Sequence, residues 1–113
     1  MTSADFRKMA LALPETVEAS HMSHPDFRVG GKIFATLGYP DPGWAMVQLP
    51  PDEQAAYVAA RPDTFTPVKG GWGKGGATNV RLRSAYRPAV RAALQSAWLA
   101  RAPKALARQF NER

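Results

Sequence analysis

The 113-residue sequence contains no cysteine, which excludes disulfide bonds, thiolate zinc sites and a cysteine nucleophile together. It also lacks a long apolar run, so we expect neither a signal peptide nor a membrane-spanning helix. Both absences favour a cytoplasmic protein in a reducing compartment. Hydrophobic residues still make up 45% of the chain, which is enough for a folded core. The length corresponds to one domain, to which we assign residues 1–113.

Carboxylates are almost missing from the second half of the sequence. Up to Thr64 the chain has five basic and eight acidic residues, whereas after it there are ten basic residues and only Glu112. The net charge of +6 is therefore concentrated after Thr64. A basic half of this kind attracts nucleic-acid phosphates or anionic lipid headgroups. A solvated basic surface without a partner explains the same charge equally well.

Only two histidines are present, His21 and His24. An imidazole pair at this spacing can chelate zinc, but a site needs further ligands. Glu18 and Asp26 are the nearest candidates, and the segment has the pattern of strand and loop rather than of a metal site. We therefore expect two polar residues at a strand end and no metal.

No catalytic set of residues is recognisable. Ser20 and Ser23 flank the histidines, but neighbours along a strand point to opposite faces of a sheet. The sequence also has no nucleophile elbow. The adjacent carboxylates Asp52 and Glu53 suit the first turn of a helix. We therefore expect neither enzymatic activity nor a cofactor.

A glycine-rich segment, residues 71–76, has the spacing of the dinucleotide-binding fingerprint. That fingerprint requires a helix after the glycines and an acidic residue about twenty positions further on. Here a strand pattern follows instead, and no carboxylate occurs between Phe65 and Asn111. A P-loop is excluded because Gly75 stands where a Ser or Thr should follow the lysine. The loop is either a flexible connection or a phosphate contact through its amides and Lys74.

The pattern of apolar residues, glycines and prolines predicts an α+β domain with a mostly antiparallel sheet covered by helices. We predict helices over residues 3–13, 51–60, 88–101 and 104–110. We predict strands over residues 16–22, 27–29, 32–37, 44–49, 65–68 and 77–83, with a loop at 70–76. Glycines supply the positive φ that a two-residue hairpin turn needs. The predicted hairpin register pairs Val29 with Lys32, Arg28 with Ile33 and Phe27 with Phe34.

The basic residues of the second half are the best candidates for a binding site. Arg81 and Arg83 would share one strand face about 6.6 Å apart, comparable to the separation of neighbouring phosphates on one strand. Trp72 would stack on a base if exposed, although we expect it to be a core residue that folds the loop down. Arg28 and Lys32 would extend the patch from the hairpin. The predicted phosphate-binding residues are Lys69, Lys74, Arg81, Arg83, Arg87 and Arg91.

Four segments resemble the bacterial MmcQ/YjbR-like proteins, in order along nearly the whole chain. They are the helix end Leu-Pro-Glu at 13–15, the hairpin His-Pro-Asp-Phe-Arg-Val-Gly-Gly-Lys-Ile-Phe-Ala at 24–35, the glycine-rich run at 71–78 and Ala-Pro-Lys at 102–104. The resemblance implies a CyaY-like fold, called a double-wing arrangement, and DNA binding. It supplies no catalytic residues.

The CyaY-like fold also raises iron binding, which the frataxins achieve with an acidic ridge on the first helix and edge strand. Here Arg7 and Lys8 stand beside Asp5 in the first helix. The ridge is therefore missing, and we expect no iron site. Likeness of fold is in any case weak grounds for function.

Two functions follow from the sequence. The first is a nucleic-acid-binding module whose contacts are chiefly with the phosphates of DNA. The second is a protein-interaction or small-ligand module without a nucleic-acid role. Four aromatic residues would line the apolar patch or pocket of that second module: Tyr39, Trp44, Trp72 and Tyr86.

Overall fold

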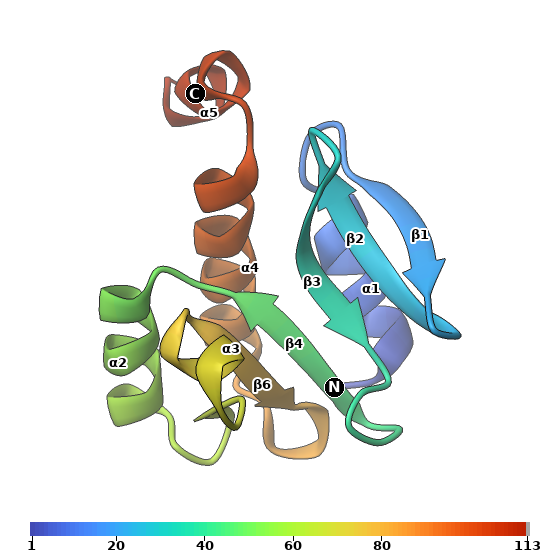
Figure 1. The fold of residues 1–113 in the computed structure, drawn as a ribbon, viewed down its shortest axis with the longest axis vertical. Helices are drawn as coiled ribbons and strands as arrows, with labels where there is room; N and C mark the ends of the chain where they lie inside the picture. The colour runs from blue at the N-terminus through green and yellow to red at the C-terminus, as the bar shows by residue number, and fades with distance from the viewer. Residues whose placement is uncertain (113) are drawn as a thin grey trace.

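The computed structural model describes residues 1–112 and has an α+β fold (Figure 1). The helices are α1 (Ser3–Leu11), α2 (Pro51–Ala60), α3 (Gly71–Lys74), α4 (Arg87–Arg101) and α5 (Lys104–Asn111), with a 3₁₀ turn at Leu82–Ser84. The strands are β1 (Val17–His21), β2 (His24–Val29), β3 (Lys32–Leu37), β4 (Trp44–Gln48), β5 (Phe65–Pro67) and β6 (Ala77–Arg81).

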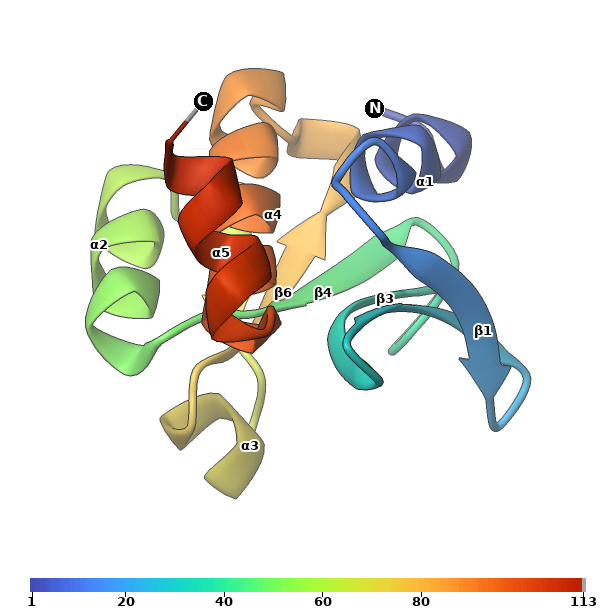
Figure 2. The ribbon, with the colours of Figure 1, turned by 90° about the horizontal axis from the view of Figure 1, so that it is seen from above.

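All six strands form one sheet in the order β1-β2-β3-β4-β6-β5, and every neighbouring pair is antiparallel. Seen from above, α1, α4 and α5 lie on one side of the sheet, and α3 projects away from them (Figure 2). The sequence prediction of an antiparallel sheet covered by helices is confirmed. Within residues 1–112, no helix is both long and apolar enough to cross a bilayer.

The two faces of the sheet differ in burial. In β4, Ala45 and Val47 are completely buried against the helices, whereas Trp44, Met46 and Gln48 on the other side are only partly covered. Directly paired residues of antiparallel strands share a face. We call the side of the sheet away from α1 and α4 the open face. One row of paired residues crosses the whole sheet on this face: Ala19, Asp26, Thr36, Met46, Asn79 and Thr66.

Helix α1 begins with a capping box. The backbone N–H of Asp5 donates to the Thr2 hydroxyl, and the backbone N–H of Thr2 donates to the Asp5 carboxylate. These bonds satisfy amides that a helix start leaves free. Phe6 and Ala10 then face the core with no exposed surface. The helix ends two residues before the predicted end, although Leu13 is still buried in the core.

The β2–β3 hairpin differs from the predicted register by one residue. Val29 pairs with Lys32 and Arg28 with Ile33 as predicted, but a bulge then shifts the pairing, so that Phe27 lies opposite Ala35. The predicted pairing of Phe27 with Phe34 is therefore wrong. A bulge lets one strand bend by placing two residues opposite one. Both phenylalanines are completely buried.

The prediction of one strand over residues 77–83 is also partly wrong. Strand β6 ends at Arg81, and the chain turns through the 3₁₀ segment, in which Leu82 is buried. The loop predicted at residues 70–76 contains the single helical turn α3. Gly76 is required there, because it has φ +109° and a Cβ would lie 1.7 Å from the Leu49 carbonyl oxygen.

Candidate nucleic-acid interface

Arg81 lies on the open face at the end of β6, directly opposite Trp44 of β4. The guanidinium carbon of Arg81 is 4.8 Å from the centre of a Trp44 ring. A cation over an indole ring is attracted by the negative face of the ring. The indole therefore orients the guanidinium and leaves its N–H donors available at the rim of the stack.

Arg81 and Arg83 line one hollow of about 290 Å³ at this end of the sheet. Its other walls are Trp44 and Thr66 from the open face and residues 62–64, which lead from α2 to β5. Arg83 belongs to the 3₁₀ turn and not to β6, so the expected shared strand face is wrong. The turn nevertheless brings both guanidinium groups to the same hollow.

Neither arginine of the hollow forms an ion pair with residues 1–112. Asp63 lines the hollow without pairing with them, and its backbone carbonyl accepts a hydrogen bond from the Ser84 hydroxyl at 2.5 Å. Both guanidinium groups are therefore free to bind an anion.

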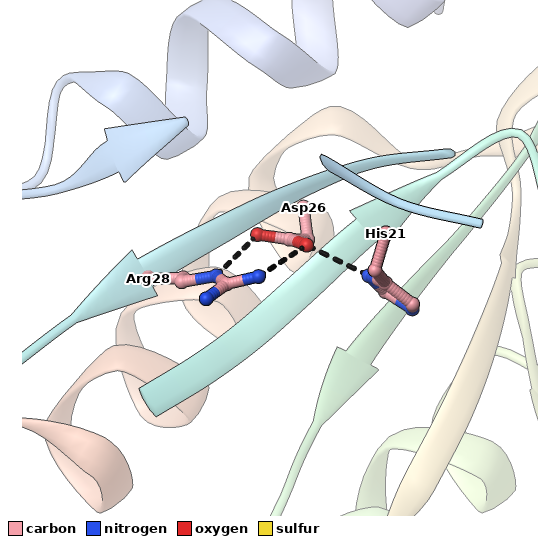
Figure 3. A network of polar contacts seen from close by, with 3 residues as sticks. All are labelled: His21, Asp26 and Arg28. Atoms are coloured by element: carbon pink, nitrogen blue, oxygen red, sulfur yellow. Dashed lines mark hydrogen bonds and ion pairs between the residues drawn. The ribbon is translucent and has the colours of Figure 1, made fainter. Parts of the chain in front are cut away.

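Arg28, which was expected to extend the basic patch, is instead neutralised within the fold (Figure 3). Its Nε and a terminal nitrogen donate to the two oxygens of Asp26 at 2.7 and 3.1 Å. Asp26 also contacts Nδ1 of His21 at 2.7 Å. Asp26 has no exposed surface, whereas the side chains of its two partners remain accessible. Arg28 is therefore a structural cation and not a free contact for phosphate.

The pKa of the Asp26 carboxyl is lowered from its ordinary value of 3.8. The largest cause is the hydrogen bonding from Arg28, which favours the ionised form. Burial acts in the opposite direction, and the contact with His21 acts in the same direction as Arg28. The carboxylate therefore stays charged in the folded protein.

The two histidines make contacts with different parts of the fold. His21 and His24 are directly opposite each other at the end of the β1–β2 hairpin, but the ring of His21 is bonded to Asp26 and His24 packs edge-on against Tyr39. Among the described residues, no three His, Asp or Glu side chains are gathered as ligands. The alternate spacing of Asp26 and Arg28 along one strand is a sequence signal for this network that the prediction did not use.

Helix α3 and the residues just before it carry a second exposed group, at the opposite end of β6. Lys69 and Lys74 are exposed, and so is Trp72, with 78% of its surface accessible. The expectation that Trp72 belongs to the core is wrong, because the short helix projects away from the helix layer (Figure 2). The side-chain amide of Gln54 in α2 stabilises this projecting segment by donating to the carbonyls of Gly73 and Ala77.

Arg87 and Arg91 do not join either group. They lie in α4 and line a different cavity, on the helix side of the sheet, which shares no residue with the hollow around Arg81. Arg87 also forms an ion pair with Asp5 at 3.4 Å. The six predicted phosphate-binding residues therefore occupy three separate places in the fold.

The four aromatic residues of the alternative interpretation are also dispersed. Trp44 lines the hollow under Arg81, and Tyr86 lies under the guanidinium of Arg61 at 3.8 Å. Tyr39 packs against His24, and Trp72 stands alone on α3. No single apolar patch or pocket is formed by the four.

Comparison with known proteins gives a family and a fold. In the solved structures, the chain is similar to the Deinococcus radiodurans protein DR2400, which has a DUF419 domain. The TM-score is 0.75 at 17% identity, over 97% of this chain and 88% of that chain. No curated protein matches.

The YjbR family model matches residues 11–100. The matched region includes every strand of the sheet, the hollow around Arg81 and Arg83, helix α3 and most of α4. With most of the chain matched, and with a solved structure of the same fold, this protein belongs to the YjbR family.

Proposed function

We propose that this YjbR-family protein binds nucleic acid through phosphate contacts along the edge formed by β5 and β6. The observation that carries the proposal is the hollow in which Arg81 and Arg83 lie together without an ion pair to residues 1–112. The proposed role is binding without a catalytic step, in the cytoplasm.

The hollow suits a phosphate by its chemistry. A guanidinium group is planar and presents its N–H donors in a fork that matches two phosphate oxygens. The stack of Arg81 on Trp44 holds this fork in place, so less side-chain entropy is lost when an anion binds. Arg83 supplies a second fork in the same hollow.

Helix α3 provides a second contact for a longer ligand. Ala77 and Arg81 are the first and last residues of β6, which places α3 and the hollow roughly 13 Å apart along the strand. That length corresponds to about four base pairs of duplex. The exposed Trp72 is suited to stacking on an unpaired base, and Lys74 beside it to another phosphate.

The test is titration of a fluorescent random-sequence DNA duplex at two salt concentrations, with a single strand of the same length as a second probe. We expect a dissociation constant of about 1–100 μM for the wild-type protein, weakening as salt is added. The Arg81→Ala/Arg83→Ala variant should bind about tenfold more weakly at low salt, because it loses both forks.

The matched control is Lys104→Ala/Arg108→Ala in α5, which removes the same charge from exposed positions outside the hollow. It should retain nearly all of the affinity. Equal losses in the two variants would mean that binding follows net charge alone, and the proposed edge would be wrong. Absence of binding by the wild-type protein at low salt would reject the function itself.

A further inference from the structure

A second cavity, of about 500 Å³, lies between α1, α4 and α5. These helices are all on the side of the sheet opposite α3 (Figure 2). Ligand pockets in proteins usually measure about 300–1,000 Å³. The cavity is therefore large enough for a small molecule, and the proposed nucleic-acid edge does not use it.

One part of the cavity wall is apolar. Met9 comes from α1 and Leu13 from the turn that follows it, Leu94 from α4 and Phe110 from α5. Leu13 and Leu94 belong to the hydrophobic core, so this wall is the surface of the core itself. An apolar group placed against it would be removed from water, which is favourable in proportion to the buried area.

The other part of the cavity wall is cationic. Lys8, Arg87 and Arg91 face it with a single carboxylate, Asp5. That carboxylate already accepts from the Thr2 amide in the capping box and from Arg87. Lys8 and Arg91 form no ion pair with residues 1–112. The cavity therefore carries two cations without a counter-charge.

The position of Arg87 and Arg91 at the start of α4 adds to the excess of positive charge in the cavity. Arg87 is the first residue of α4, Arg91 follows one turn later, and the first turn contains no acidic residue. Cations at the positive end of a helix are unfavourable, and an anion there is favourable. An anionic group bound in the cavity would be attracted by the side chains and by the helix together.

We infer that this cavity binds a small amphipathic anion, with its acidic head between Lys8 and Arg91 and its apolar body against Leu13, Leu94 and Phe110. The head is a carboxylate or a phosphate, since both accept from these donors. The body is a short alkyl chain or a ring, in keeping with the volume of the cavity.

Trp98 provides a local readout of binding. It is completely buried behind the cavity wall, where its indole N–H donates to the carbonyl of Pro14 at 3.0 Å and its ring lies 5.0 Å from that of Phe110. Pro14 and Phe110 both line the cavity. A ligand in the cavity should therefore shift the indole N–H resonance of Trp98, while those of Trp44 and Trp72 stay in place.

The experiment titrates the full chain with octyl phosphate, below its micelle-forming concentration, and follows the three indole resonances. Inorganic phosphate and 1-octanol are titrated separately as the head and the body alone. We expect octyl phosphate to bind at least tenfold more tightly than either one. A Trp98 shift that inorganic phosphate reproduces at the same concentration would overturn the amphipathic ligand and leave a simple anion site.

Two variants test the two parts of the wall. Arg91→Gln removes an unpaired cation and should weaken octyl phosphate about tenfold, whereas Lys104→Gln in α5, outside the cavity, should not. Ala12→Trp places a large side chain at an exposed lining position and should block binding without disturbing the core. If neither Arg91→Gln nor Ala12→Trp changes the affinity, the ligand is elsewhere and the inference is wrong. Anionic vesicles that shift Trp98 more strongly than octyl phosphate would assign the site to a membrane lipid instead.

Discussion

Asp26 shows how one buried charge is made stable in this protein. An isolated carboxylate without exposed surface would be costly, because it loses its contact with water. Two nitrogens of Arg28 and the ring of His21 replace that contact, and each partner stays accessible to solvent. Breaking such a pair from one side leaves a charge without compensation.

We therefore predict that Asp26→Asn lowers the free energy of unfolding at neutral pH by about 2 kcal/mol, the size expected for hydrogen bonds to a charged group. Denaturant unfolding measures the change. Asp41→Asn is the control, because Asp41 is exposed and has no ion pair with residues 1–112. A loss for Asp41→Asn as large as that for Asp26→Asn would show that the network has no special role.

The same pair predicts a dependence on pH. The pKa of Asp26 is lower in the folded protein than its ordinary value of 3.8, so the unfolded chain takes up a proton first as the pH falls. The stability that Asp26 supplies is thus complete above about pH 5 and is lost progressively as the pH falls below 3.8 and through the lower pKa of the folded state. The difference in stability between the wild type and Asp26→Asn should be smaller at pH 3 than at pH 6. A difference that is constant across this range would contradict the lowered pKa.

Two arginines of this protein have different roles because different side chains lie beside them. Arg28 faces a carboxylate on its own strand face, and Arg81 faces an indole on the neighbouring strand. The first is used for stability, and the second retains its hydrogen-bond donors. Residue type alone does not distinguish these two cases.

At the scale of elements, α3 depends on a contact with α2. Its single turn cannot be stable by itself, because short helices have too few hydrogen bonds to offset their ordering. Gln54 is buried and donates to the carbonyl of Gly73 within the turn and to that of Ala77 at the start of β6. The position of the exposed Trp72 and Lys74 therefore depends in part on one side chain of α2, together with backbone hydrogen bonds and the Gln48 amide, which donates to the Gly75 carbonyl.

We predict that Gln54→Ala leaves both carbonyls without this donor and loosens α3. Amide hydrogen exchange should become faster over residues 70–76, because the local opening there needs less free energy. Exchange in α4 should change little. Gln95→Ala, in α4 on the other side of the molecule, is the control. Unchanged exchange at 70–76 in the Gln54 variant would mean that the other hydrogen bonds, from the backbone and from Gln48, are enough to hold the turn.

The bulge between β2 and β3 is a second local feature that follows from packing rather than from the turn sequence. The Gly30-Gly31 turn fixes the first two pairs as the sequence predicts, and the shift comes after them. Beyond the bulge, Phe27 faces the core beside Phe6 of α1, and Asp26 faces the open side. The bulge therefore allows the hairpin to pack Phe27 against α1 while Asp26 stays on the open face.

At the scale of the whole molecule, the positive charge is divided among three places, one of which lies on the helix side of the sheet, away from the hollow and α3. Arg81 and Arg83 lie in the hollow, Lys69 and Lys74 lie just before and within α3, and Arg87 and Arg91 lie on the helix side. The basic second half is thus not a single binding face. The number of phosphates contacted at one time is correspondingly small.

This division predicts a shallow salt dependence. For duplex DNA, the slope of log K against log salt concentration is about −0.9 for each phosphate neutralised. The hollow alone should give a slope of about −2, and the hollow with α3 about −4. Six residues on one face would give about −5. Affinities measured at four or more salt concentrations decide between these values, and a slope of −5 or steeper would contradict the separation of the sites.

The sequence by itself determined the α+β class, all the strands and the long helices, because these follow from local signals: apolar period, prolines, glycines and capping residues. Helix α2, for example, has the predicted bounds. It also predicted that Arg81 and Arg83 lie close together, because residues two positions apart are close in any backbone conformation. Only the tertiary structure decided which cations are neutralised and which remain free. Arg28 is neutralised by Asp26 only two positions away, but the same spacing also occurs without a contact. Arg87 is paired with Asp5, 82 positions away in the chain, and no local pattern records such a contact.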